Sequence, residues 1–141
     1  MPNATCLRGN HEDAAIRAYH EWNKISVDER KTSKLLRFYS YVQHFTKEDI
    51  DFLTTLPYTL TLSTWNAIVV HAGLVPNVAL ENQCKTLMYK LRNVIRDEKE
   101  DGKFTGTDSD LLGEPWGKHW PGPQHVYFGH DAKRGLQVYR L

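Results

Sequence analysis

Apolar residues predict helices in two stretches of the first third of the chain, residues 12–25 and 33–44. The first stretch sets alanines among charged residues, and the second follows the i, i+3, i+4, i+7 spacing of one buried helix face. A further helix is predicted to begin after Thr46, because a threonine hydroxyl is a good N-cap and the acidic residues after it favour the positive helix end. Pro57 is expected to end that helix.

Runs of apolar residues predict strands in the remainder of the chain. Residues 59–64 alternate between apolar and polar, which is typical of a half-exposed strand. Residues 67–70 are all apolar and indicate a strand buried on both faces. Residues 125–128 are predicted as a second buried strand and residues 136–139 as a third, while residues 4–7 look like the tail of a buried strand.

Helices placed between these strands indicate an α/β layered sheet. A helix is predicted over residues 84–96, and the charged, Gly-rich stretch 97–118 is predicted to be a surface loop. The length of 141 residues fits one domain over residues 1–141. An apolar content of 40% is lean for a domain that stands alone.

Charge and cysteine usage narrow the classes of protein. A net charge of +1 gives no broad electrostatic footprint for nucleic acid. No apolar run approaches the roughly 18–20 residues of a membrane span, and no signal peptide is visible at the start. The two cysteines, Cys6 and Cys84, make no disulfide framework, so a reducing, cytoplasmic setting is expected.

Three apolar segments end in small residues beside potential metal ligands. Asn10 follows Gly9, His71 precedes an Ala-Gly pair, and His130 follows Gly129. Ligands bind at the carboxyl ends of strands in open α/β sheets, and an amide oxygen with two imidazoles suits a borderline cation such as zinc, manganese or iron. A single His or Gly-Asn pair of this kind is more often structural, but three in one short chain favour a site.

The residues around these ligands resemble three signatures of the calcineurin-like metallophosphoesterases. They are Leu7-Arg8-Gly9-Asn10-His11-Glu12, Val70-His71-Ala72-Gly73-Leu74 and the run Phe128-Gly129-His130-Asp131-Ala132-Lys133-Arg134-Gly135-Leu136. The last run is typical of the eukaryotic branch that is similar to bacterial symmetrical diadenosine tetraphosphatase. The resemblance implies an α/β/β/α sandwich and a phosphoester or phosphoanhydride hydrolase with two divalent metal ions, whose bridging hydroxide attacks phosphorus.

The resemblance also implies roles for single residues. Asn10, His71 and His130 match ligands of the second metal, which would be manganese, zinc or iron. His11 matches the general acid, because an imidazole can give up a proton near neutral pH. Arg8 matches either a buttress or a weak phosphate contact.

Further side chains have a binding interpretation and a structural one. Arg92 is either a phosphate clamp or a surface helix arginine. Trp116 and Trp120 are expected to pack in the core more than to stack on a base. Lys133 and Arg134 could attract an anion or simply lie in a solvated turn.

Two family signatures with a Gly-Asp core, which lie upstream in the family, are absent from the sequence. The expectation is therefore a partial phosphoesterase domain over 1–141, with its first strands missing, incomplete at both ends and inactive as it stands. Two explanations stay open: a truncated hydrolase sequence, which is favoured, and a non-catalytic remnant that acts as an interaction module. A phosphorylated small molecule or phosphoprotein is the expected substrate, with no membrane and no nucleic acid beyond a nucleotide or cap-like group.

Overall fold

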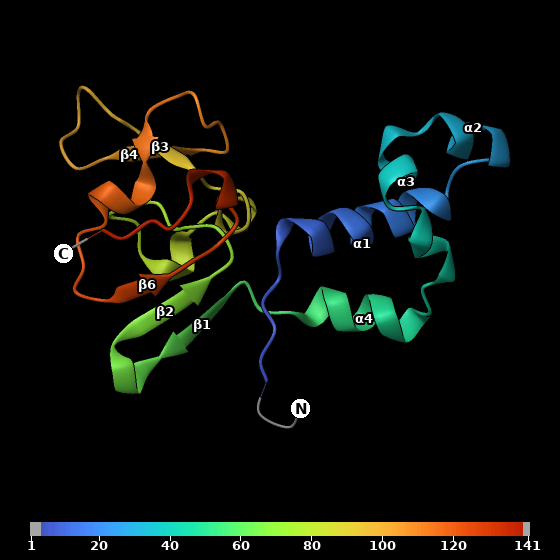
Figure 1. Cartoon of the computed structure of the whole chain (residues 1–141), viewed down its shortest axis with the longest axis horizontal. Coiled ribbons are helices and arrows are strands. Elements are labelled where there is room, and N and C mark those ends of the chain that lie inside the picture. The colour runs from blue at the N-terminus through green and yellow to red at the C-terminus, as the bar shows by residue number, and fades with distance from the viewer. Residues whose placement is uncertain (1–3, 140–141) are drawn as a thin grey trace. The chain divides into compact units, whose positions relative to one another are not determined.

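The structure is a computed structural model that describes residues 4–139. The chain forms two compact units (Figure 1). The helical unit comprises Asn10–Leu56, and the sheet unit comprises the residues up to Gly9 together with those from Pro57 onward. A single domain over residues 1–141 stays a prediction.

The helical unit contains four α-helices and a short 3₁₀ helix: α1 (Asn10–Trp22), α2 (Val27–Thr32), α3 (Lys34–Phe38), the 3₁₀ helix η1 (Ser40–His44) and α4 (Lys47–Thr55). Its core is small and consists of Ala15, Ala18, Leu36 and Val42. The predicted helix over 12–25 is confirmed as α1, which begins and ends slightly earlier. Helix α2 was not predicted, because it buries no residue and so leaves no apolar spacing in the sequence.

The single helix predicted over 33–44 is wrong, because the chain breaks at Tyr39 into α3 and a 3₁₀ turn. Leu36 and Val42 are both almost fully buried, at 2% and 0% exposure. Six residues of continuous α-helix would point them about 120° apart. The break lets both side chains reach one core.

Capping hydrogen bonds define the start of α4 as the sequence predicted. The Thr46 hydroxyl accepts the Asp49 N–H, and the Asp49 carboxylate accepts the Thr46 N–H, which is a capping box. Ile50 is buried at 7% exposure. Helix α4 ends at Thr55, two residues before Pro57.

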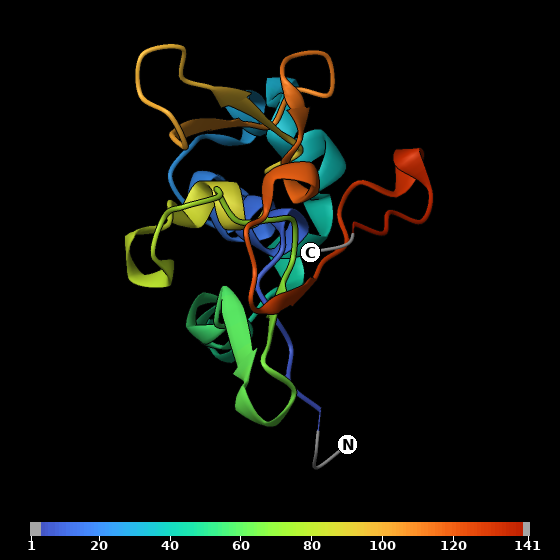
Figure 2. The same cartoon turned by 90° about the vertical axis from the view of Figure 1, so that its left-hand side faces the viewer.

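The sheet unit contains two three-stranded sheets, which Figures 1 and 2 show as separate layers. The first has the order β1-β2-β6, with β1 (Thr59–Leu62), β2 (Ala67–Val70) and β6 (His125–Tyr127). The second has the order β4-β3-β5, with β3 (Asn93–Arg96), β4 (Phe104–Thr107) and β5 (Glu114–Pro115). Strands β1 and β2 are antiparallel, β2 and β6 are parallel, and the second sheet is antiparallel throughout.

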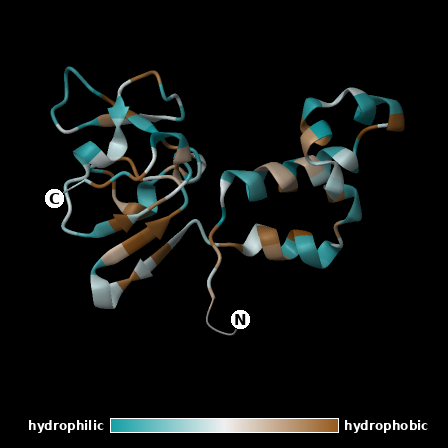
Figure 3. Cartoon of the chain, viewed as in Figure 1, coloured by the Kyte–Doolittle hydropathy of each residue, from teal (hydrophilic) through white to brown (hydrophobic). Residues whose placement is uncertain are grey.

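The predicted strands over 59–64, 67–70 and 125–128 are confirmed, with shorter bounds for the first and third. Strand β2 is buried as predicted and stands out as an apolar segment in Figure 3. Strand β6 is not the buried strand that was expected, because Tyr127 is 59% exposed. It lies at the edge of its sheet and has one neighbour, β2.

Four further expectations are corrected in the sheet unit. The helix over 84–96 is only one turn, α5 (Lys85–Met88), and is followed by β3. The loop over 97–118 contains β4 and β5, which pair with β3. Residues 4–7 and 136–139 form no strand, because no neighbouring strand supplies backbone partners there.

The chain is mixed α/β, as predicted, and both of its sheets lie in one unit. Both cysteines, Cys6 and Cys84, are free and exposed. None of the helices over residues 4–139 has both the length and the hydrophobicity that crossing a bilayer needs.

Candidate functional site

Two of the predicted ligands, His71 and His130, lie side by side. His71 directly follows β2, and His130 comes shortly after β6. Because β2 and β6 are parallel neighbours, their carboxyl ends meet at the same edge of the sheet. The two imidazole centroids are 5.3 Å apart with the rings tilted by 56°. The sheet therefore brings together two predicted ligands that are far apart in sequence.

The backbone around His130 is held in an unusual turn. His130 has a φ of 65°, in the left-handed region that few non-glycine residues adopt. The Gly129 N–H donates to the His71 carbonyl at 2.9 Å, and the Asp131 N–H donates to the Gly129 carbonyl at 2.7 Å. A strained conformation persists when its surroundings fix it, and such positions often lie at functional sites.

Asp131 is a buried carboxylate between two arginines. It is 6% exposed and forms ion pairs with Arg92 and with Arg134, whose Nε lies 3.2 Å from Oδ2. Arg134 also donates from Nη1 to Asn93 Oδ1 at 2.8 Å. A buried charge requires such partners. Two cations on one anion leave the turn after His130 with a local positive charge.

Arg92 does not lie on a helix, so the surface-helix interpretation is wrong. It precedes β3, and its N–H donates to the Thr107 carbonyl. Its side chain is 21% exposed, so it is partly accessible although it is paired with Asp131. A guanidinium has five N–H donors and can contact a further anion while it keeps one partner.

Trp116 packs in the core next to His71, as the sequence favoured. It is 3% exposed, and its Nε1 donates to the Ala72 carbonyl at 3.2 Å. Gly73 makes this packing possible, because a Cβ on Gly73 would lie 2.4 Å from Trp116 Nε1. Because Ala72 and Gly73 are small, the Trp116 indole can pack directly on the loop that follows His71.

His11 and Asn10 lie at the start of α1 in the helical unit. Asn10 is half-buried and His11 is exposed. His11 Nδ1 is 3.0 Å from the Tyr39 hydroxyl. If this hydroxyl donates, the ring proton sits on Nε2, the nitrogen from which a general acid could give it.

Tyr39 contacts His11 and also packs against the core of the helical unit. Its partner Tyr41 has a raised pKa, first because it is partly desolvated and then because Tyr39 and Glu12 add negative potential. A second tyrosine, Tyr41, thus lies next to the one that contacts His11, with ring centroids 6.0 Å apart. The spacing of apolar residues in the sequence cannot show that the hydroxyl of a partly buried tyrosine contacts a histidine.

Arg8 lies over an aromatic ring in the sheet unit. Its guanidinium carbon is 5.3 Å from the centroid of Tyr58, which is a cation–π contact. Its N–H donates to the Pro57 carbonyl at 2.8 Å. These contacts fit the buttressing interpretation, and a phosphate contact stays a prediction.

The fit to a metal is partial. A zinc ion lies about 2.0–2.1 Å from an imidazole nitrogen, so rings 5.3 Å apart can hold one cation between them. Across residues 4–139, however, no group of three or more His, Cys, Asp or Glu side chains could hold an ion. The structure thus brings two of the predicted ligands together, His71 and His130.

The chain was compared with family models, curated protein sequences and solved structures. No family model matches the chain, and no curated protein sequence matches it. A solved structure described as a "putative diadenosine tetraphosphatase" aligns with a TM-score of 0.76 and 28% identity, over 96% of this chain. The alignment spans 53% of that protein, so this chain corresponds to about half its length. The resemblance indicated by the three signatures is thus confirmed in the fold, which is that of about half of a diadenosine tetraphosphatase, a metallophosphoesterase.

Proposed function

We propose that this chain is the histidine-bearing part of a metal-dependent phosphoanhydride hydrolase that acts on a nucleotide. The observation that carries the proposal is the adjacent pair His71 and His130 at the ends of two parallel strands. The alignment with the tetraphosphatase structure, over 96% of the chain, supports it. Neutral imidazole is a common ligand of zinc, iron and related ions.

Further residues take roles in this proposal. Asn10 would add an amide oxygen to the cation ligands, and His11 would protonate the leaving oxygen, with Tyr39 fixing its ring. Arg92, held by Asp131, would bind a phosphate oxygen through its remaining N–H donors. Arg8 would support the loop that leads to α1.

A second candidate function is nucleotide or partner binding without turnover. It is favoured by the absence of a third His, Cys, Asp or Glu ligand in the described part of the chain. Under either candidate we expect the 141-residue chain alone to leave p-nitrophenyl phosphate intact in the presence of manganese. Robust turnover that is abolished by His11→Ala would show that the described ligands suffice.

The test uses the longest protein that the transcript encodes. Sequencing the 5′ end shows whether an in-frame Gly-Asp-x-His lies upstream, and a start codon preceded by in-frame stop codons would favour the second candidate. With such a protein, diadenosine tetraphosphate should be hydrolysed, and His11→Ala or His130→Ala should lower kcat by about a hundredfold or more. His20→Ala, on the exposed side of α1, is the matched control and should retain activity. Unchanged activity in His130→Ala would contradict the proposal.

A further inference from the structure

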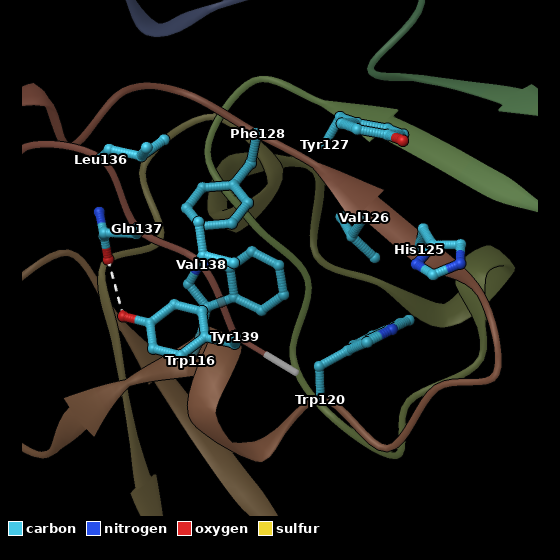
Figure 4. A pocket seen from close by; sticks show the side chains of 11 residues that line it. Trp116, Trp120, His125, Val126, Tyr127, Phe128, Leu136, Gln137, Val138 and Tyr139 are labelled. Atoms are coloured by element: carbon cyan, nitrogen blue, oxygen red, sulfur yellow. Dashed lines mark hydrogen bonds between the residues drawn. The ribbon is translucent and has the colours of Figure 1, made fainter. Parts of the chain in front are cut away.

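An aromatic cavity of about 390 Å³ lies beside β6 in the sheet unit (Figure 4). Most of its wall is apolar. The lining residues used below are Trp116, Trp120, His125, Phe128, Gln137 and Tyr139. Small-molecule sites have volumes of roughly 300–1,000 Å³, with apolar and aromatic walls and a few polar groups.

The walls of this cavity are fixed. Trp116 Nε1 donates to the Ala72 carbonyl at 3.2 Å, and Trp120 Nε1 donates to the Gln124 carbonyl at 2.8 Å. The two indoles meet edge to face, with centroids 6.1 Å apart. Because both N–H groups already have acceptors, the indoles offer the cavity carbon surface and π-electron density.

Tyr139 forms a further wall and needs a glycine to do so. A Cβ on Gly117 would lie 2.4 Å from Tyr139 Cδ2, so the ring lies directly on the Gly117 backbone. The Tyr139 hydroxyl donates to Gln137 Oε1 at 2.9 Å (Figure 4). The Gln137 amide nitrogen carries two further donors, and His125 adds a ring nitrogen to the lining.

The cavity continues toward His130. A second hollow of about 150 Å³ is lined by His130 and Asp131, and it shares Phe128, Leu136 and Gln137 with the larger cavity. The linings of the two hollows differ, although neither contains a Lys or Arg. Aromatic rings line the large cavity, whereas His130 and Asp131 line the small one, and Asp131 is paired with two arginines.

We propose that the aromatic cavity binds the nucleobase of a nucleotide, with the phosphates directed to the small hollow at His130. This inference rests on the proposed function and names the part of the substrate that the described residues recognise. Aromatic side chains stack on any base, and cationic side chains attract phosphate. The large cavity offers aromatic surface to a base, and the small hollow offers a phosphate the His130 imidazole beside an Asp131 whose charge two arginines offset.

The experiment follows the four tryptophan indole N–H signals of the ¹⁵N-labelled chain by NMR during titration with adenosine, ADP or inorganic phosphate. Adenosine should shift the signals of Trp116 and Trp120 and leave those of Trp22 and Trp65 in place. Phosphate alone should leave all four indole signals in place. Unshifted Trp116 and Trp120 signals at millimolar adenosine would overturn the inference, and so would equal shifts with benzene, which indicate an unspecific apolar void.

Two variants separate this inference from the proposed function. Tyr139→Ala should weaken adenosine binding about fivefold or more, since one stacking partner is lost, while Tyr41→Ala in the helical unit should not. His130→Ala should weaken ADP binding without changing adenosine binding. If adenosine binds here but ADP binds no tighter, the base site stands and the phosphate role fails. If ADP binds through His130 without moving the indoles, the base site fails and the phosphate role stands.

Discussion

The helical and sheet units are stabilised over different distances in sequence. Each α-helix start in residues 26–49 has a side-chain cap within three residues, such as Ser26 with Glu29 or Thr46 with Asp49. The sheet unit is closed by long-range contacts, for example the hydrogen bond from Asn66 to the Pro123 carbonyl, 57 residues away. Removal of one helix cap affects only that helix, whereas loss of a long-range contact affects several strands. The two regions should therefore respond differently to substitution.

The largest effect is expected in the sheet core. Leu74 is fully buried, at 0% exposure, in the cluster that also contains Ile68 and Val70. Leu74→Ala should lower the free energy of unfolding by about 2–5 kcal/mol through lost burial and a cavity. Chemical denaturation measures this. Leu136→Ala, at a site with 92% exposure, is the control and should change stability by less than about 0.5 kcal/mol.

A smaller effect is expected from two glycines at the candidate site. Gly73→Ala should destabilise the sheet unit by about 1–3 kcal/mol, because its Cβ would collide with the Trp116 indole. Gly129→Ala should be much milder, because the nearest atom to its Cβ would be 3.6 Å away. Thermal unfolding and the Trp116 indole N–H signal report the difference. Equal destabilisation by the two variants would show that the indole does not hold the loop.

The helical unit should show a smaller, local effect. Thr46→Ala removes the hydroxyl that accepts the Asp49 N–H and should cost about 1 kcal/mol. Hydrogen exchange should increase in α4, while protection of β2 stays unchanged. The exposed Thr64→Ala is a control. A loss of protection in both units would contradict the local character of this cap.

The smallest effect depends on pH. The pKa of Asp49 is lowered from its ordinary value of 3.8, first by the Thr46 N–H and then by the Thr46 hydroxyl. A carboxylate whose folded pKa is lowered adds stability above its unfolded pKa and loses it as the pH falls through the folded pKa. Asp49→Asn should therefore be less stable than the natural chain at neutral pH and equally stable in strong acid. A stability difference between Asp49→Asn and the natural chain that does not change with pH would show that the Asp49 charge is not its cause.

The sequence predicted the elements whose signals are local. The cap at Thr46 and the apolar run 67–70 both lead to the expected element. Val94 was misassigned because it fits a helical spacing, yet it pairs with Gly106 in a stretch predicted as loop. Residues 136–139 alternate like a strand, but Leu136 is 92% exposed and has no neighbouring strand. The apolar pattern of a segment does not show whether another strand lies beside it to pair with, so these two segments could not be assigned from sequence.

The candidate site was predictable in part for the same reason. His71 and His130 were identified from the small residues beside them, and the structure brings their rings together. The buried position of Asp131 between two arginines was missed, although one of them, Arg134, is only three residues away. Arg92 is the partner that only the fold reveals.

The proposed cation site is tested most directly by a titration of the labelled chain with Mn²⁺, followed through the histidine ring signals. The signals of His71 and His130 should broaden together at the lowest Mn²⁺ concentration. His71→Ala should remove the effect on His130, since two imidazoles bind a cation more tightly than one. Equal or earlier broadening of the remaining histidines outside the site, His20, His44, His119 and His125, would contradict it.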